Sequence, residues 1–340
     1  MRTDDFDYFL PENLIAQTPV TPRDSSRLLV FDRKNNALFH KHFYNVLDYL
    51  NEGDVLVRNK TKVLPARMFG YTKNGGRVEI LLLKRLDLKV WEVLCKPAKK
   101  AKEGAVIVIS DELSLTVNSR DESAGSRIVE FNFNGVFEDI ISRLGEMPLP
   151  PYITEKLKDK DRYQTVYATS TGSAAAPTAG LHFTEELLEK IKAKGVIIAD
   201  VVLHVGLGTF RPVKVEDVKN HHMHSEYYEV SEQTAEIVNL AKKEGRRVVA
   251  VGTTSVRTLE SVAEESGLIR AGKGNTDIFL YPPYKMKTVD ALITNFHLPK
   301  STLIMLVSCL VSREKILEIY QTAVKENYRF FSFGDAMMII

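Results

Sequence analysis

The strongest constraint on the fold is a change of pattern along the chain. Short apolar and β-branched runs, separated by turn-rich pieces, fill residues 77–133. From residue 182 onward, strand-like and helix-like segments alternate instead. Short strands at close spacing predict a small barrel or sandwich, whereas strand–helix alternation predicts an α/β domain with a largely parallel sheet. The sequence therefore predicts two different folds in one chain.

The central block contains five predicted strands and ends in a proline cluster. The strands are expected at residues 77–84, 89–95, 105–109, 113–118 and 127–133. The segment MPLPPY, residues 147–152, has the composition of a linker.

The alternating part contains predicted helices at residues 182–195, 231–245 and 256–266, with another from 301. Thr184 and Ser231 are suitable N-caps, and Gly195 and Gly245 are suitable stops. Two strand-like runs near the N-terminus, 27–33 and 54–59, are expected to join the same sheet. We therefore predict a main α/β domain made of residues 1–61 plus 150–340, interrupted by a β domain at 62–149.

Charge is unevenly distributed, although the 340-residue chain has a formal net charge of only +2. Residues 62–102 carry eleven Lys and Arg against three acidic residues, a net charge of +8. Residues 103–150 carry a net charge of −6. The basic stretch could face nucleic-acid phosphates, or its charges could be neutralised across neighbouring strands. Both interpretations stay open from sequence alone.

The compartment is suggested by three features. Cys95 and Cys309 have no neighbouring Cys or His at zinc spacing, so neither a disulfide framework nor a cysteine metal site is predicted. The acidic N-terminus, broken by Pro11, does not resemble a signal peptide. The longest apolar stretch, 303–311, is shorter than the roughly 20 residues that span a bilayer. We expect a cytoplasmic protein.

The most unusual segment is STGSAAAPTAGLHF, residues 170–183, which precedes a predicted helix. Its small residues would let a ligand approach the backbone, and a helix N-terminus favours an anion. Thr178 adds a hydroxyl, and His182 adds a group that titrates near neutral pH. The alternative is a tight packing joint, where small residues are needed only for fit.

Three further turns follow predicted strands. In residues 203–213, Phe210 and Arg211 could stack on a base and hold a carboxylate, or Arg211 could form a surface ion pair. Residues 251–260 and 294–302 offer hydroxyl and amide groups at helix starts, although Thr254 or Ser255 could be a simple N-cap. Because ligands of α/β sheets gather beyond strand ends, the four turns predict one composite site.

The HHMHSE segment, residues 221–226, raises the question of a metal. If it is extended, His222, His224 and Glu226 lie on one face, and such a set can bind zinc or iron. No other His or Cys lies close in sequence to complete the shell. Substrate contact or acid–base chemistry by His224 or Glu226 is the preferred interpretation.

Seven blocks together resemble one family, the S-adenosylmethionine:tRNA ribosyltransferase-isomerases of queuosine biosynthesis. These blocks are PRDSSRLLV, RNKTKVLPARMFG, GSAAAPTAGLHFT, HVGLGTFRPV, HHMHSEYY, VGTTSVRTLES and TNFHLPKSTLIMLVS. The resemblance implies a barrel-like main α/β domain with an inserted small antiparallel β-barrel. It also implies transfer and isomerisation of the ribosyl group of S-adenosylmethionine onto 7-aminomethyl-7-deazaguanine at the tRNA wobble position. Epoxyqueuosine-tRNA, adenine and methionine would be the products.

Within the matching blocks we assign hypothetical roles. S-adenosylmethionine is consumed as a substrate, and no metal or other cofactor is expected. The acid–base candidates are His182, His224, Glu226 and His297. The substrate-binding candidates are Thr178, Thr209, Phe210, Arg211, Thr253, Thr254, Arg257 and Asn295. The tRNA-binding candidates are Arg67, Lys99, Lys100 and Lys102, and we expect a monomer that acts on tRNA away from any membrane.

Two other functions are kept as alternatives. One is an S-adenosylmethionine-dependent tRNA methyltransferase, which would release S-adenosylhomocysteine. The other is a non-catalytic RNA-binding protein, whose affinity would depend strongly on salt.

Overall fold

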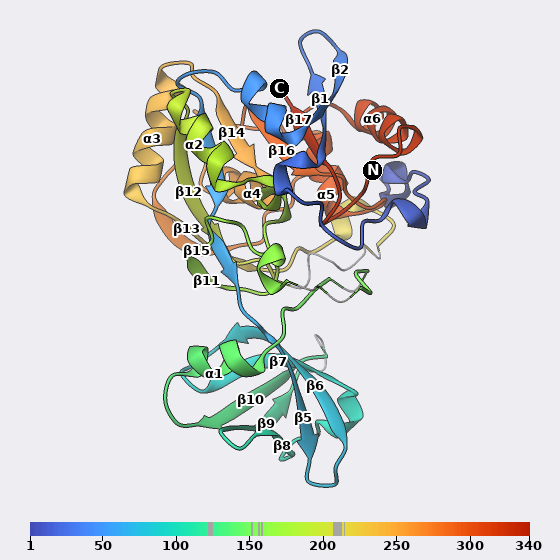
Figure 1. Cartoon of the computed structure of the whole chain (residues 1–340), viewed down its shortest axis with the longest axis vertical. Coiled ribbons are helices and arrows are strands. Elements are labelled where there is room, and N and C mark those ends of the chain that lie inside the picture. The colour runs from blue at the N-terminus through green and yellow to red at the C-terminus, as the bar shows by residue number, and fades with distance from the viewer. Residues whose placement is uncertain (122–124, 151, 156, 158, 207–212, 214) are drawn as a thin grey trace. The chain divides into compact units, whose positions relative to one another are not determined.

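The computed structural model describes residues 1–121, 125–150, 152–155, 157, 159–206, 213 and 215–340. It divides into two compact units (Figure 1). The main unit consists of Met1–Lys62, Pro151–Ser170 and Ala176–Ile340, and the barrel unit consists of Val63–Pro150 and Thr171–Ala175. Within the described ranges, every helix is too short or too polar to cross a membrane.

The main unit is built on one nine-stranded sheet with the order β15-β13-β12-β3-β14-β16-β17-β1-β2. Its strands are β1 (Arg27–Asp32), β2 (Ala37–His42), β3 (Val55–Asn59), β12 (Ile197–Leu203), β13 (Glu226–Val230), β14 (Val248–Val251), β15 (Gly272–Thr276), β16 (Ala291–Asn295) and β17 (Ala336–Ile339). The prediction that the two N-terminal strands join this sheet is confirmed, because β1 and β3 both lie inside it.

The sheet is mixed, so the prediction of a largely parallel sheet is wrong. The strands β12, β3, β14 and β16 pair in parallel, as do β1 and β17. The remaining ladders are antiparallel. A parallel neighbour needs a crossover connection, usually one helix. The alternation of one strand with one helix is interrupted at two places. Two helices lie between β16 and β17, and β13 is the next strand after β12.

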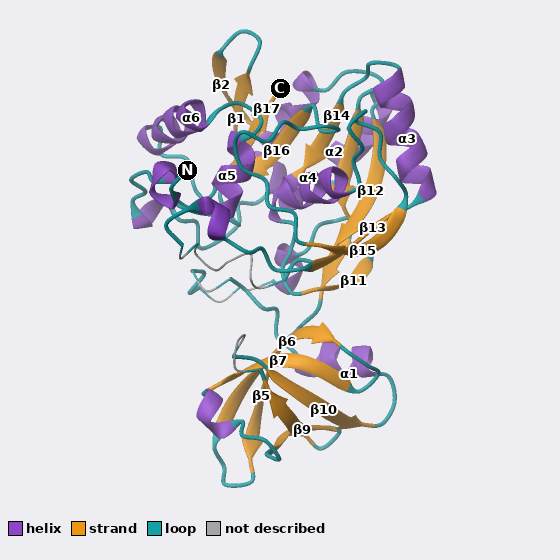
Figure 2. Cartoon of the chain, turned by 180° about the vertical axis from the view of Figure 1, so that it is seen from behind, coloured by secondary structure: helices purple, strands orange, loops and turns teal. Residues whose placement is uncertain are grey.

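Among its described residues, the main unit has five α-helices. They are α2 (Glu185–Ala193), α3 (Glu232–Lys243), α4 (Gly252–Ser261), α5 (Thr302–Ser308) and α6 (Arg313–Lys325), shown in Figure 2. The Thr184 and Ser231 hydroxyls accept from the amides of Leu187 and Thr234, each at 3.1 Å, so both predicted N-caps are confirmed.

The sheet has apolar side chains on both faces. Val55 and Val57 belong to one core cluster, which also takes side chains from α3 to α6. Leu56, between them, belongs to another cluster that includes Leu187 and Ile191 of α2. Because successive strand residues point to opposite faces, this division buries the sheet from both sides and leaves the strand ends as its polar edges.

The barrel unit is a closed barrel of six strands in the order β10-β7-β6-β5-β8-β9. The strands are β5 (Arg67–Thr72), β6 (Arg77–Arg85), β7 (Val90–Lys96), β8 (Val106–Ser110), β9 (Leu113–Arg120) and β10 (Arg127–Phe133). All six ladders are antiparallel. Helix α1 (Phe137–Leu144) packs Phe137 against Trp91 and Phe131 of the barrel core. The predicted α/β fold with an antiparallel β-barrel is therefore confirmed.

Two short strands, β4 (Thr61–Val63) and β11 (Ser170–Ser173), form a small sheet of their own. After β11, the small-residue segment enters the 3-10 helix η7 (Thr178–His182). A Cβ atom on Gly180 would lie 2.0 Å from the Tyr167 hydroxyl oxygen and 2.8 Å from Thr165 Cγ2. Part of this segment is therefore a packing joint, which was the alternative interpretation.

We expect Gly180→Ala to lower the free energy of unfolding by about 1–3 kcal/mol, because the added methyl group overpacks a buried contact. Urea unfolding measures this change. Gly274→Ala is the matched control, since the nearest atoms to its Cβ would be the Tyr228 hydroxyl oxygen at 3.5 Å and ring carbons at 3.6 Å and beyond. Equal stabilities of the two variants would contradict the packing argument.

Candidate active site

A pocket lies in the main unit where β14 and β16 end. These strands are parallel neighbours, so their carboxyl ends meet at the same edge of the sheet. The pocket is lined by Ala176, Pro177, Thr178, Ala179, Val205, Gly252, Thr253, Thr254, Thr294, Asn295, Phe296, His297, Leu303, Phe331 and Ser332. The structure therefore brings together residues from all four of the turns singled out in the sequence.

Asn295, the last residue of β16, is the centre of a hydrogen-bond network beside the pocket. Its Nδ2 donates to the Phe331 carbonyl at 3.2 Å and to His182 Nε2 at 3.0 Å. Its Oδ1 accepts from the Thr178 hydroxyl at 3.1 Å. A carbonyl oxygen can only accept, so the contact with Phe331 fixes which side of the amide carries the nitrogen. The second Nδ2 hydrogen then requires a lone pair on His182 Nε2.

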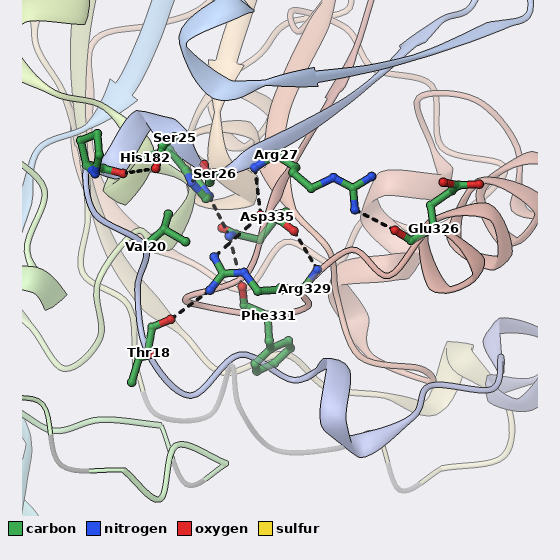
Figure 3. Close-up of polar contacts among 12 residues, drawn as sticks. Thr18, Val20, Ser25, Ser26, Arg27, His182, Glu326, Arg329, Phe331 and Asp335 are labelled. Atoms are coloured by element: carbon green, nitrogen blue, oxygen red, sulfur yellow. Dashed lines mark hydrogen bonds and ion pairs between the residues drawn. The ribbon is translucent and has the colours of Figure 1, made fainter.

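His182 is therefore a neutral imidazole with its proton on Nδ1. That nitrogen lies 2.8 Å from the Ser26 hydroxyl, to which it donates (Figure 3). Burial lowers the pKa of His182 to about 3, and the charges of Arg329 and Arg23 act in the same direction. Both ring nitrogens are engaged, so His182 orients the Asn295 amide, and through it the Thr178 hydroxyl.

His297 differs from His182 because it lines the pocket itself. Its Nε2 lies 3.0 Å from the Thr294 hydroxyl, and burial lowers its pKa to about 3. The Tyr320 hydroxyl accepts from its backbone N–H at 3.1 Å, and the Tyr8 hydroxyl donates to its carbonyl. These two hydrogen bonds fix the backbone of His297 and so keep its neutral side chain at the pocket wall.

Glu226 and Arg257 form a buried ion pair with side chains only 2% and 4% exposed. One carboxylate oxygen contacts Arg257 Nη1, and the other accepts from the Gly206 amide at 2.8 Å. Arg257 Nη2 is buried without a hydrogen-bond partner. Glu226, an acid–base candidate, and Arg257, a substrate-binding candidate, therefore contact each other next to the end of β12.

Helix α4 begins at Gly252 and ends at Ser261, so the predicted helix at 256–266 starts too late and ends too late. The two threonines, Thr253 and Thr254, lie in its first turn and line the pocket. The N-cap alternative is wrong, because the N-cap is Val251 and the Ser255 hydroxyl donates back to the Val251 carbonyl at 2.7 Å. The Thr254 hydroxyl is buried without a hydrogen-bond partner.

Five of the predicted main-domain residues line this pocket, namely Thr178, Thr253, Thr254, Asn295 and His297, whereas His182, His224, Glu226 and Arg257 do not. His224 is exposed, as is His222, whereas Glu226 is buried, so the three do not form one cluster. In the part of the chain that the structure describes, no three His, Cys, Asp or Glu side chains are grouped to hold a metal ion. Thr209, Phe210 and Arg211 lie outside the described residues.

The tRNA-binding candidates lie in the barrel unit. Arg67 forms a 2.8 Å ion pair with Glu79, and its guanidinium lies 5.3 Å from the centre of the Phe69 ring. Lys99 and Lys100 lie in the 3-10 helix η5 (Ala98–Lys100), and Lys102 follows it. The three lysines are exposed.

Sequence reasoning missed three residues that shape the site. Ser26 holds His182, whereas Phe331 and Ser332 line the pocket. Ser26 lies in the PRDSSRLLV block, which signalled a resemblance without a role. The sequence around Phe331 and Ser332 contains no motif that indicates a site. These residues reach the pocket only because the chain passes beside the end of β16 again near its C-terminus.

The buried histidines should make folding stability depend on pH. Each has an ordinary pKa of 6.5, lowered to about 3 in the fold. The unfolded chain therefore gains a proton at each histidine below pH 6.5, whereas the native chain does not until about pH 3. Their contribution is complete above pH 6.5 and is lost as the pH falls toward 3, at about 1.4 kcal/mol per pH unit for each histidine.

Urea unfolding between pH 7 and pH 5 measures this slope. We expect His182→Gln to reduce the slope by about 1.4 kcal/mol per pH unit in the lower part of that range. His222→Gln, at an exposed position, should keep the wild-type slope. An unchanged slope in His182→Gln would show that this histidine titrates as it does in the unfolded chain.

The comparisons with known proteins agree with the resemblance seen in the sequence. A model of the family described as "Queuosine biosynthesis protein" matches residues 3–339. The chain is 60% identical over 336 residues to the S-adenosylmethionine:tRNA ribosyltransferase-isomerase of Fusobacterium nucleatum subsp. nucleatum. That alignment covers 98% of this chain and 96% of the relative.

A solved structure is also similar. The crystal structure of an S-adenosylmethionine tRNA ribosyltransferase from Thermotoga maritima at 2.00 Å resolution matches with 41% sequence identity and a TM-score of 0.57. The match covers 99% of this chain and 100% of that one. From the blocks in its sequence, its α/β and barrel folds, and these matches, the chain belongs to the queuosine biosynthesis protein family.

Proposed function

We propose that this protein is an S-adenosylmethionine:tRNA ribosyltransferase-isomerase. It transfers and isomerises the ribosyl group of S-adenosylmethionine onto 7-aminomethyl-7-deazaguanine at the wobble position of tRNA. The products are epoxyqueuosine-tRNA, adenine and methionine. The observation that carries the proposal is the 60% identity to the Fusobacterium enzyme over nearly the whole chain. We further propose that S-adenosylmethionine is a substrate rather than a retained cofactor, and that a monomer acts in the cytoplasm.

The pocket chemistry fits a substrate with polar and apolar parts. The main-unit pocket combines alanine and phenylalanine surface with threonine hydroxyls and one imidazole. The first turn of α4 contributes backbone N–H groups that favour an anionic group. Thr178 has its hydroxyl proton committed to Asn295, so its oxygen is left to accept from a ribose hydroxyl.

The reaction needs a base for the proton beside the sulfonium at C5′ and an acid that assists departing adenine. Among the acid–base candidates, His297 is the imidazole that lines the pocket. It is neutral at physiological pH, so one ring nitrogen carries a lone pair, but the burial that lowers its pKa also makes that nitrogen a weaker base than a free imidazole. Glu226 holds Arg257 and the Gly206 amide in place beside the end of β12. We assign His182 a positioning role and His224 none in proton transfer.

The direct test is an incubation with S-adenosylmethionine and tRNA that carries 7-aminomethyl-7-deazaguanine. Adenine, methionine and the modified nucleoside should appear in equal amounts. Release of S-adenosylhomocysteine would instead indicate a methyltransferase. tRNA binding without consumption of S-adenosylmethionine would indicate an RNA-binding protein.

In the same assay, we expect His297→Gln to lower kcat by about 10²- to 10⁴-fold, the usual contribution of a positioned acid or base. Glu226→Gln should also lower kcat, because the buried Arg257 guanidinium loses its charged partner. His222→Ala, an exposed histidine in the 221–226 segment, is the control and should retain wild-type turnover. Near-normal turnover in both Gln variants would remove these two residues from the mechanism.

The exposed lysines of the barrel unit should contribute to tRNA affinity by neutralising phosphates. Replacement of Lys99, Lys100 and Lys102 by Ala should raise KM for tRNA and leave KM for S-adenosylmethionine unchanged. The slope of log affinity against log salt should fall by about 1 for each phosphate that the protein no longer neutralises. Ala substitution of exposed Lys190, Lys192 and Lys194 in or directly after α2 is the charge-matched control, and an equal effect would indicate only the change in net charge.

A further inference from the structure

A second, smaller cavity lies in the main unit beside His182. Arg23, Arg162, His182 and Ser332 are among its lining residues. Ser332 lines both cavities, and His182 is bonded to Asn295, which lines the larger pocket. The smaller cavity is therefore one side chain away from the candidate active site, and none of the roles assigned so far uses it.

Two arginines supply positive charge to this cavity without a carboxylate partner. Arg23 lies in the 3-10 helix η3 (Arg23–Ser25), and Arg162 lies in η6 (Lys160–Tyr163). Among the described residues, neither guanidinium has an Asp or Glu oxygen within 4.0 Å. Asp159 and Asp161 favour the charged form of Arg23 only from a distance.

Both guanidiniums retain donors. Arg23 donates to the carbonyls of Leu181 and Asp161, at 3.2 and 2.8 Å. Arg162 donates to the Thr21 hydroxyl at 2.6 Å and to the Val20 carbonyl. A guanidinium has five N–H groups, so these contacts fix each side chain and leave N–H groups unused. The Nε of Arg162 is buried without a hydrogen-bond partner.

The positive charges of Arg23 and Arg162 also repel each other. Burial lowers the pKa of Arg23, and the charge of Arg162 lowers it further. Arg329, which donates to the Thr18 carbonyl and forms a 3.7 Å ion pair with Asp335, adds positive charge near the neighbouring His182 (Figure 3). Half-buried cations that repel one another are stabilised by an anion, and the planar guanidinium matches carboxylate and phosphate oxygens.

We propose that Arg23 and Arg162 form an oxyanion-binding site behind His182. The inference rests on the proposed function, which brings two such oxyanions to this unit: the carboxylate of S-adenosylmethionine and a phosphodiester of tRNA. The site recognises either by charge-assisted hydrogen bonds from the unused guanidinium N–H groups. Because Arg23 also holds the Leu181 carbonyl, next to His182, an anion here fixes the histidine that orients Asn295.

The test uses full-length Arg23→Gln and Arg162→Gln, with Arg23→Lys as the variant that keeps the charge. Arg33→Gln is the matched control. Arg33 is more exposed but likewise donates to backbone carbonyls, those of Ile340, Leu310 and Asp290, and it lines neither cavity. Each protein is assayed for adenine release with S-adenosylmethionine, with decarboxylated S-adenosylmethionine, and with varied tRNA and salt.

If the site takes the carboxylate, Arg23→Gln and Arg162→Gln raise KM for S-adenosylmethionine about tenfold to a hundredfold. The two variants then lose the wild-type preference for S-adenosylmethionine over decarboxylated S-adenosylmethionine. If the site takes a phosphodiester, KM for tRNA rises instead, and the salt slope falls by about 1 for each arginine. In either case Arg23→Lys recovers part of the loss, and Arg33→Gln changes neither KM.

The proposal is overturned if the Gln variants keep both KM values and the salt slope. It is also overturned if the Gln variants lose activity only together with a fall in Tm, and Arg33→Gln shows the same combined loss. The arginines would then only tie backbone segments together. Failure of the proposed function is a separate result, since it would appear as no adenine release by the wild-type protein.

Discussion

The candidate site depends on the parallel pairing of β12, β3, β14 and β16. Parallel strands end at the same edge of a sheet, and apolar packing on both faces fixes their register. Val205, the first turn of α4 and the residues around Asn295 are thereby delivered to one place from distant parts of the chain. The antiparallel neighbours of this group contribute their starts to the same edge: β13 begins with Glu226, and β17 begins opposite Asn295, shortly after the pocket residues Phe331 and Ser332.

Within that edge, hydrogen bonds select the chemical state of each group. The Phe331 carbonyl orients the Asn295 amide, the amide selects the tautomer of His182, and the Ser26 hydroxyl accepts a hydrogen bond from His182 Nδ1. The network uses buried groups that are all satisfied, so a change in one alters the others. Because of this network, His182, which the sequence suggested for acid–base chemistry, positions its neighbours instead. His297, with the same type of side chain and a similarly lowered pKa, keeps access to the pocket.

Local patterns predicted much of the fold, and they failed where long-range contacts decide. Thr184 and Ser231 mark their helices because capping is local. Strand β5 was missed because Gly70 interrupts its pattern; a Cβ there would lie 2.8 Å from the Val108 carbonyl oxygen, so the barrel requires the glycine. The start of α4 was missed because Val251 has no capping side chain. The four turns identified the pocket, but the partners that set the state of His182 come from 113 to 156 residues away and carry no local signal.

The central claim is that S-adenosylmethionine binds at the edge formed by β14, β16 and the segment before η7. Hydrogen–deuterium exchange of the full-length protein, with and without S-adenosylmethionine, tests it most directly. The account predicts slower amide exchange at residues 176–182, 252–255 and 295–297, and unchanged exchange in the barrel strands at 77–133. Protection confined to the barrel strands, or spread evenly over both units, would contradict it.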